Sequence, residues 1–340
     1  MKKILALVCA VLMVLALTAC GQTAAPAPSA APAESAAPAE SAAPAESPES
    51  FTIGICQLVQ HPALDAATQG FKDALTELLG DSVTFVEQKA SGDSATCSVI
   101  CTQFVSDEVD LIMANATAAL QAAASATADI PILATSITDY GTALSIEGWT
   151  GTTGMNISGT SDLAPLDGQA AMLNELFPEA KTVGILYCSG EPNSKYQADT
   201  IRPMLEDYGY TVTEYTFADS NDVSSVTATA CSEVDVLYIP TDNTAASCTE
   251  AINNVALNAG VPIIAGEEGI CSGCGVATLS ISYYDIGYAT GEMAYEILVN
   301  GADVSAMEVQ YAPQFTKEYN AAICEALQIT VPEDYVAIGE

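Results

Sequence analysis

Short apolar segments alternate with segments of helical periodicity along most of the chain. Residues 51–58 have the composition of a buried strand, and apolar side chains then recur at helical spacing from Leu64 to Leu78. The pattern returns with strands at 83–86, 111–114 and 130–134, and again at 183–187, 212–217, 234–239, 261–265 and 276–281. Strict alternation of this kind predicts parallel sheets covered by helices on both faces.

The folded part is long enough for more than one core. Residues 51–340 of the 340-residue chain follow the alternating pattern, which exceeds the length that one compact core usually holds. A Gly- and Thr-rich strip at 148–159 separates two runs of the pattern. The sequence therefore predicts an α/β protein with two doubly wound parallel-sheet lobes and a cleft between them.

The N-terminus has the composition of an export signal. Lys2 and Lys3 precede an apolar stretch at 4–17, which is shorter than a bilayer-spanning helix and favours a signal peptide over residues 1–19. Leu17-Thr18-Ala19-Cys20 resembles the lipobox of bacterial lipoproteins, so Cys20 is expected to carry lipid and to hold the protein at the outer face of the membrane. An ordinary secretory signal is the alternative.

Residues 20–50 have a composition that cannot build a core. After Cys20 they consist almost entirely of Ala, Pro, Ser and Glu and repeat the phrase Ala-Pro-Ala-Glu-Ser from Ala31, Ala37 and Ala43. Such a segment is typical of an extended, solvated tether between a lipid anchor and a folded domain.

Charge and cysteine content exclude several classes of function. A formal net charge of −35 argues against binding to nucleic acid or to anionic lipid. The single histidine and the absence of GxGxxG and GxxxxGK[ST] motifs argue against catalysis, so we expect no enzyme, no cofactor and no metal. Of the 11 cysteines, nine follow Cys20, and most of these are expected to be small buried hydrophobes. Cys271-Ser272-Gly273-Cys274 is expected to form a turn between two strands rather than a redox pair.

Ligands of doubly wound folds bind beyond the carboxyl ends of the strands, so the loops there carry the functional information. Several of these loops, read together, have a family likeness. The pieces that carry it are Gly54-Ile55, His61-Pro62-Ala63-Leu64-Asp65, Ala116-Thr117-Ala118, Thr138-Asp139, Ser161-Asp162-Leu163, Glu191 with Asn193-Ser194, and Pro240-Thr241-Asp242-Asn243.

Over nearly all of residues 51–330 the chain resembles substrate-binding lipoproteins of ABC transporters, in particular tryptophan- and tyrosine-type amino-acid receptors. The resemblance implies a type I periplasmic-binding-protein fold in which the chain passes three times between lobes. It places 51–158 plus 282–308 in the first lobe and 159–281 plus 309–340 in the second. Many relatives have proline where this chain has Ala118 and Tyr140, so the pocket is expected to differ from theirs.

The loops and the resemblance together define the candidate ligand-binding residues. These are Gln57, His61, Thr117, Thr138, Asp139, Asp162, Glu191, Asn193, Ser194, Asp242, Asn243 and Glu268. An amino acid needs donors for its carboxylate, acceptors for its ammonium and a selective wall for its side chain. We expect hydroxyls and helix N-terminal N–H groups to hold the carboxylate, with Thr117 and Ser194 as leading donors; N-capping of the following helices is the alternative.

Other candidates also have two interpretations. Asp242 or Glu268 is expected to offset the ammonium, although Asp242 also suits a helix cap and Glu267-Glu268 a solvated turn. Asp162 suits a hinge as well as a contact, and His61 suits a cap as well as stacking on an apolar group. Tyr140, Trp149, Tyr283 and Tyr284 form an aromatic wall or simply pack at the lobe crossings.

The expected function is capture of a small molecule, an aromatic or other apolar amino acid, and its delivery to an ABC permease by a monomeric binding protein. An anchored sensor that reports occupancy to a signalling partner would use the same fold, and a non-amino-acid metabolite is the alternative ligand.

Overall fold

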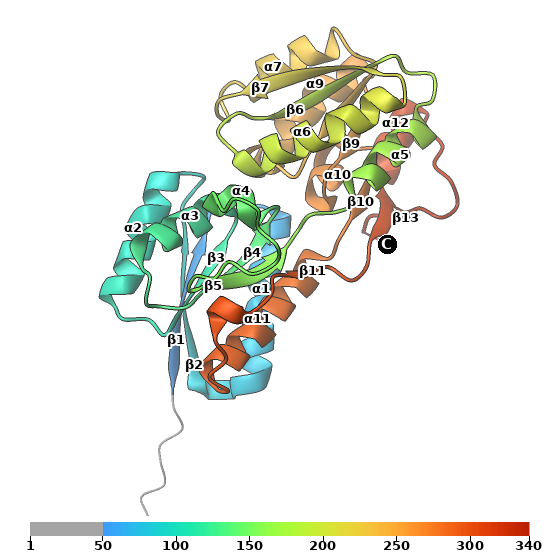
Figure 1. Cartoon of the computed structure of the whole chain (residues 1–340). Helices are drawn as coiled ribbons and strands as arrows, with labels where there is room; N and C mark the ends of the chain where they lie inside the picture. The colour runs from blue at the N-terminus through green and yellow to red at the C-terminus, as the bar shows by residue number, and fades with distance from the viewer. Residues whose placement is uncertain (1–49, 340) are drawn as a thin grey trace, which may run out of the picture. The chain divides into compact units, whose positions relative to one another are not determined.

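A computed structural model of the chain describes residues 50–339 (Figure 1). The predicted signal peptide, the predicted lipidation site Cys20 and nearly all of the predicted tether lie outside the described residues. Within 50–339, no helix combines the length and the apolar composition that crossing a membrane requires.

The first lobe is a parallel sheet with helices on both faces. Its strands are β1 (Phe51–Gln57), β2 (Val83–Lys89), β3 (Leu111–Asn115), β4 (Ile132–Ile137), β5 (Ile157–Ser161) and β11 (Gln310–Tyr311), in the spatial order β11-β5-β4-β3-β1-β2. Its helices are α1 (Pro62–Leu79), α2 (Ser94–Ser106), α3 (Thr117–Ala126), α4 (Tyr140–Leu144) and α11 (Tyr283–Leu298), with short 3-10 turns η1 (Gly80–Ser82) and η2 (Val304–Ala306).

Successive side chains of β1 point to opposite faces of the sheet, so the core of this lobe has one part on each face. Ile53 and Ile55 pack with Phe71 of α1 and Met293 of α11 on one face, whereas Cys56 packs with Phe104 of α2 on the other. Helices α1 and α11 lie side by side although they are far apart in the sequence (Figure 1). Their N-termini lie at the edge where β1 and β4 end, which places them beside the candidate site.

The second lobe repeats this architecture. Its strands are β6 (Thr182–Cys188), β7 (Thr211–Phe217), β8 (Val236–Ile239), β9 (Ile263–Ala265), β10 (Ala277–Ser280), β12 (Thr316–Tyr319) and β13 (Val336–Ala337), in the order β13-β12-β10-β9-β8-β6-β7. Its helices are α5 (Leu166–Leu176), α6 (Pro192–Asp207), α7 (Val223–Cys231), α8 (Asn243–Ser247), α9 (Thr249–Ala259), α10 (Glu268–Cys274) and α12 (Ala321–Leu327). Strand β12 runs antiparallel to β10, and the other pairs are parallel. The predicted fold class, two α/β lobes with parallel-dominated sheets, is confirmed.

The chain passes between the lobes at 162–165, at 281–282 and at 312–315. The expected boundary at 158/159 therefore cuts through β5, and the one at 308/309 assigns β11 to the wrong lobe. Strand β5 has the sequence Ile-Ser-Gly-Thr-Ser, whose small polar residues favour a loop in the sequence pattern. It is nevertheless entirely buried, because it pairs with β4 on one side and with β11 on the other.

The Cys271–Cys274 segment is not the expected turn. It forms the last part of α10, and both thiols are buried among apolar residues of the second lobe. Glu267 supplies the N-cap that starts this short helix, a signal that the glycine- and serine-rich sequence conceals. The prediction that most cysteines are buried is confirmed for Cys56, Cys97, Cys101, Cys188, Cys271, Cys274 and Cys324.

Candidate ligand-binding site

A small cavity lies where the carboxyl ends of the two sheets face each other, and we call it the interlobe cavity. The first lobe contributes His61, Leu64, Ser136 and Tyr283 to its lining. The second lobe contributes Asn193, Thr241, Asp242, Asn243, Ala246 and Glu267, and the first crossing contributes Asp162. Residues from both lobes and from one crossing therefore meet at one point.

Hydrogen bonds connect the lobes around this cavity. Gln197 Nε2 in α6 donates to Thr138 Oγ1 of the first lobe at 3.2 Å, and Thr138 Oγ1 donates to Asp162 Oδ1 at 3.1 Å. Tyr283 Oη donates to the other oxygen, Asp162 Oδ2, at 2.9 Å. Asp162, in the first crossing, is thus bonded to Thr138 and to Tyr283, which directly follows the second crossing. Gln197 was not among the predicted site residues, because its role depends on a partner in the other lobe.

Two carboxylates organise the N-terminus of α8. Glu191 Oε1 accepts from Thr244 N at 2.8 Å, and its Oε2 accepts from Asn243 N at 2.9 Å and from Asn243 Nδ2 at 2.7 Å. Asp242 accepts from Ala245 N and from Cys188 N, both at 2.7 Å. The capping interpretation of Asp242 is therefore confirmed, and Asp242 also lines the cavity.

Other helix N-termini near the cavity are also satisfied by the protein itself. Glu267 accepts from Gly269 N at 2.6 Å and from Ile270 N at 2.5 Å, and Asp139 accepts from Thr142 N at 2.7 Å. A ligand carboxylate cannot use those N–H groups. In the described part of the chain, α1, α3 and α6 begin without a side-chain cap and remain available for that role.

Thr117 and Ser194 do not occupy the positions expected of them. Thr117 is the first residue of α3, whose N-cap is Ala116, and it lies outside the cavity lining. Ser194 lies inside the first turn of α6, and its hydroxyl donates to the Thr241 carbonyl at 3.3 Å. Their capping interpretation is wrong, because both hydroxyl residues lie inside their helices, after the N-cap positions Ala116 and Glu191.

The side chain of Gln57 forms hydrogen bonds to the loop after β1 and to the first turns of α1. Its Nε2 donates to the Val59 carbonyl at 2.8 Å and to Asp65 Oδ1 at 2.7 Å, while its Oε1 accepts from Thr68 Oγ1 at 2.7 Å. These bonds leave it outside the cavity lining. Gln57 is a residue that positions the His61 loop.

The interlobe cavity brings together part of the predicted set. The predicted residues that line it are His61, Asp162, Asn193, Asp242 and Asn243. The predicted residues outside its lining are Gln57, Thr117, Thr138, Asp139, Glu191, Ser194 and Glu268. The lining residues missing from the predicted set are Leu64, Ser136, Thr241, Ala246, Glu267 and Tyr283. Ser136 lies near the end of β4, and Thr241 and Glu267 come two residues after β8 and β9, so their positions pointed to the loops but not to single side chains.

Of the four aromatic residues considered for a wall, only one lines the interlobe cavity. Tyr283 lines the cavity, whereas Tyr140 is buried with its hydroxyl donating to the Ala134 carbonyl at 2.9 Å. Trp149 stacks on Tyr140 with ring centroids 5.9 Å apart, and the exposed Tyr284 donates to Asp73 at 3.0 Å. Packing therefore explains Tyr140 and Trp149, whereas Tyr284 lies at the surface.

The interlobe cavity is rich in buried carboxyl groups. No lysine or arginine occurs among the described residues that line it. Burial raises the pKa of Asp162 to about 6 and that of Glu267 to about 7. The pKa of Asp242 also lies well above its ordinary value, chiefly through burial and secondly through the neighbouring charge of Glu191. Such groups favour a cationic partner in the cavity.

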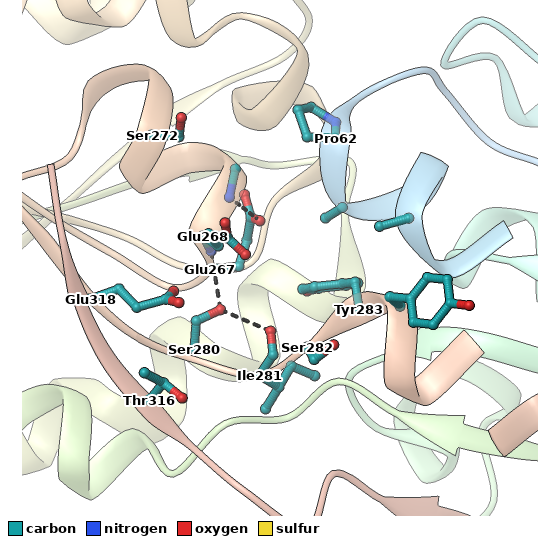
Figure 2. Close-up of a pocket in the computed structure, with 14 residues that line it drawn as sticks. Pro62, Glu267, Glu268, Ser272, Ser280, Ile281, Ser282, Tyr283, Thr316 and Glu318 are labelled. Carbon is teal, nitrogen blue, oxygen red and sulfur yellow. Dashed lines mark hydrogen bonds between the residues drawn. The ribbon is translucent and has the colours of Figure 1, made fainter. Parts of the chain in front are cut away.

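A larger cavity of about 460 Å³ adjoins the first and shares Glu267 and Tyr283 with it (Figure 2). Glu268 lies in this second cavity, where its backbone N–H donates to Ser280 Oγ at 3.1 Å. Figure 2 shows Glu318 on the same side as Ser280, and burial together with the charge of Glu268 raises the pKa of Glu318 to about 7. Glu267 rather than Glu268 therefore reaches the interlobe cavity.

The raised pKa values predict how the ligand-free protein responds to pH. The pKa of Glu267 rises from 4.5 to about 7 on folding, so the folded state holds a proton that the unfolded state releases between those values. The free energy of unfolding should consequently fall as pH rises from about 4.5 to 7. Urea unfolding at several pH values measures this slope, and Glu267→Gln should flatten it. An unchanged slope in the variant would show that Glu267 titrates normally.

Similar structures have the same arrangement of lobes. An ABC transporter domain from Streptococcus pneumonia, solved in complex with L-Trp, superposes with a TM-score of 0.80 at 32% identity, over 84% of this chain and 97% of that one. A solute binding protein from Bacillus halodurans with bound myo-inositol superposes with a TM-score of 0.57 at 16% identity, over 83% and 99%, and shows the fold alone. The lobes and their crossings define the type I periplasmic-binding-protein fold.

The sequence model of the ABC transporter substrate binding protein family matches residues 52–338, and the chain belongs to this family. A tyrosine-binding protein from Clostridioides difficile is 40% identical over 252 residues, which cover 72% of each chain. The ligand-free, open structure of a substrate binding protein with adhesive properties from Clostridium difficile is 38% identical, with a TM-score of 0.65 over 85% of this chain and 99% of that one. The prediction of a solute-binding protein rather than an enzyme is confirmed by the family.

Proposed function

We propose that this protein binds an aromatic amino acid between its lobes and delivers it to the permease of an ABC importer. The observation that carries the proposal is the interlobe cavity, where Asp162, Asp242 and Glu267 are buried with no lysine or arginine in the described lining. A ligand ammonium would supply the missing positive charge.

Apolar surface for the side chain is close to these carboxyl groups. Leu64, Ala246 and Tyr283 line the interlobe cavity itself. A further cavity of about 400 Å³ shares Asn243 with it. Its lining combines Leu58, Val59 and Ala118 with polar residues that include Asp93, Glu191 and Asp219. The names of the relatives support an aromatic side chain, because one is a tyrosine-binding protein and another was solved with L-Trp.

A thermal-shift comparison tests the ligand class. L-tyrosine or L-tryptophan at about 100 times its Kd should stabilise the purified protein by about 2.7 kcal/mol and raise Tm by a few degrees. L-lysine, L-glutamate and myo-inositol serve as controls and should leave Tm unchanged. A shift with myo-inositol alone, or with none of the amino acids, would overturn the proposal of an amino-acid receptor.

We further propose that Cys20 anchors the protein at the outer face of the membrane as a monomer. The support is the lipobox-like sequence ahead of Cys20 and the tether that follows it. Cys20→Ala should release the protein into the soluble fraction and reduce uptake of labelled tyrosine by cells. Unchanged uptake on deletion of the whole protein would instead favour a sensor.

A further inference from the structure

His61 has an unused hydrogen-bonding atom in the interlobe cavity. It stands at the N-cap position of α1 before Pro62, and the residue is only 7% exposed. Among the described residues, nothing pairs with its Nδ1 atom. A buried nitrogen without a partner costs free energy, so a group supplied from outside the chain would satisfy it.

The partner of the opposite ring nitrogen fixes the tautomer of His61. Asn243 Nδ2 donates to Glu191 Oε2 at 2.7 Å, which fixes the orientation of the Asn243 amide. Its Oδ1 therefore faces His61 Nε2, at 3.4 Å. An amide oxygen only accepts hydrogen bonds, so Nε2 carries the proton. Burial lowers the pKa of His61 and keeps the ring neutral, so Nδ1 is an acceptor.

Ser136 adds a second unsatisfied atom from the same lobe. The residue is 6% exposed and lines the cavity, and its Oγ has no partner within the described residues. Its φ of 58° lies in the left-handed region, where β4 changes register against β5. Residues other than glycine rarely adopt that backbone conformation, so the surrounding structure must hold Ser136 in it.

The atoms around the cavity are mainly acceptors. His61 Nδ1 accepts, the carboxyl groups of Asp162, Asp242 and Glu267 accept when ionised, and Ser136 Oγ accepts or donates. A ligand group with several N–H donors and a positive charge matches this set, and a primary ammonium has both properties.

We propose that His61 is a specificity-determining residue whose Nδ1 accepts a hydrogen bond from the primary ammonium of the ligand. This inference rests on the proposed function and goes beyond it, because it names the ligand group that is recognised and the residue that recognises it. The ammonium rather than the carboxylate then decides whether a compound is accepted. An amine without a carboxylate should retain the contact, and an acid without an ammonium should lose it.

Calorimetry with three related ligands tests the inference: L-tyrosine, tyramine and 3-(4-hydroxyphenyl)propionate. The wild-type protein should bind the propionate at least about tenfold more weakly than tyrosine, since a hydrogen bond to a charged group is lost. His61→Phe, which has no acceptor, should weaken binding of tyrosine and tyramine by about tenfold or more and leave binding of the propionate unchanged. His61→Asn, with an oxygen near the position of Nδ1, should recover part of the loss.

Gln60→Ala is the matched control, because Gln60 is the exposed neighbour of His61 and lies outside the cavity lining. Circular dichroism confirms that each variant folds. Equal weakening of all three ligands by His61→Phe would show a steric role, and equal wild-type affinity for tyrosine and the propionate would exclude ammonium recognition. Either result overturns the inference while the aromatic-ligand proposal stands.

The experiment also identifies the opposite case, in which the aromatic-ligand proposal fails and the role of His61 holds. If the protein binds leucine instead of tyrosine, the same comparison is made with leucine, isoamylamine and 4-methylpentanoate. A His61-dependent preference for the two amines would then support the role of His61 although the aromatic proposal had failed. Binding of no amino acid and no amine would overturn both.

Discussion

Gly287→Val is expected to lower the free energy of unfolding by at least about 3 kcal/mol. A Cβ atom at Gly287 would lie 2.0 Å from the Ala67 carbonyl oxygen and 2.7 Å from Ala67 Cα. These are backbone atoms of α1, so they cannot rotate away, and α1 and α11 would have to separate. Gly70 shows the reciprocal contact, because a Cβ there would lie 2.1 Å from the Tyr284 carbonyl oxygen. Urea unfolding measures the loss.

The control for this prediction is Glu292→Ala, an exposed change in the same helix. Its effect should stay within about 0.5 kcal/mol. Gly287→Ala provides a second comparison, because alanine favours a helix over glycine by about 1 kcal/mol when nothing clashes. If Gly287→Ala stabilised the protein, the close approach of the two helices would be disproved.

Glu191→Ala is expected to destabilise the second lobe by at least about 3 kcal/mol and to weaken ligand binding at least about tenfold. The carboxylate holds the N–H groups of Asn243 and Thr244 and also the Thr244 hydroxyl, at 2.7 Å. Their loss leaves partly buried donors without an acceptor. Asn243 would no longer be held against His61, so the effect on binding should follow. Urea unfolding and calorimetry with tyrosine measure the two losses.

The size of this effect should depend on hydrogen bonding rather than on charge. Glu191→Gln keeps the shape but sets an NH₂ group against donors, so it should also destabilise the protein. Glu206→Ala, at the other end of α6, removes an exposed carboxylate 3.8 Å from Arg202 and should change little. Equal effects of Glu191→Ala and Glu206→Ala would contradict the capping role of Glu191.

The alternation of strands and helices was sufficient to predict the fold class, because periodicity is a local property that survives in the tertiary structure. Strand β5 could not be predicted from periodicity. Gly159 adopts a φ of 143°, and a Cβ at this position would lie 1.9 Å from the Ala134 carbonyl oxygen. Close packing against β4 therefore explains a glycine that resembles loop sequence, and only the neighbouring strand reveals it.

The site was predictable as a set of loops but not as a set of contacts. Asp242 and Glu191 both follow strands and both accept hydrogen bonds from the N-terminus of α8, yet only Asp242 lines the interlobe cavity. Glu267 and Glu268 are adjacent, but only Glu267 borders both cavities. Asp242 and Glu267 both cap a helix and still border the interlobe cavity, so capping does not decide which carboxylate lies there. That depends on distances between segments far apart in the sequence.

The repeated passage of the chain between lobes affects the order of folding. Helix α1 meets α11 only after residues 166–280, which build most of the second lobe, have been synthesised. Until then the apolar side of α1, including Phe71 and Leu75, has no covering helix. Contacts of such long sequence separation slow folding, so a newly made first lobe remains incomplete and exposes apolar surface for most of its synthesis.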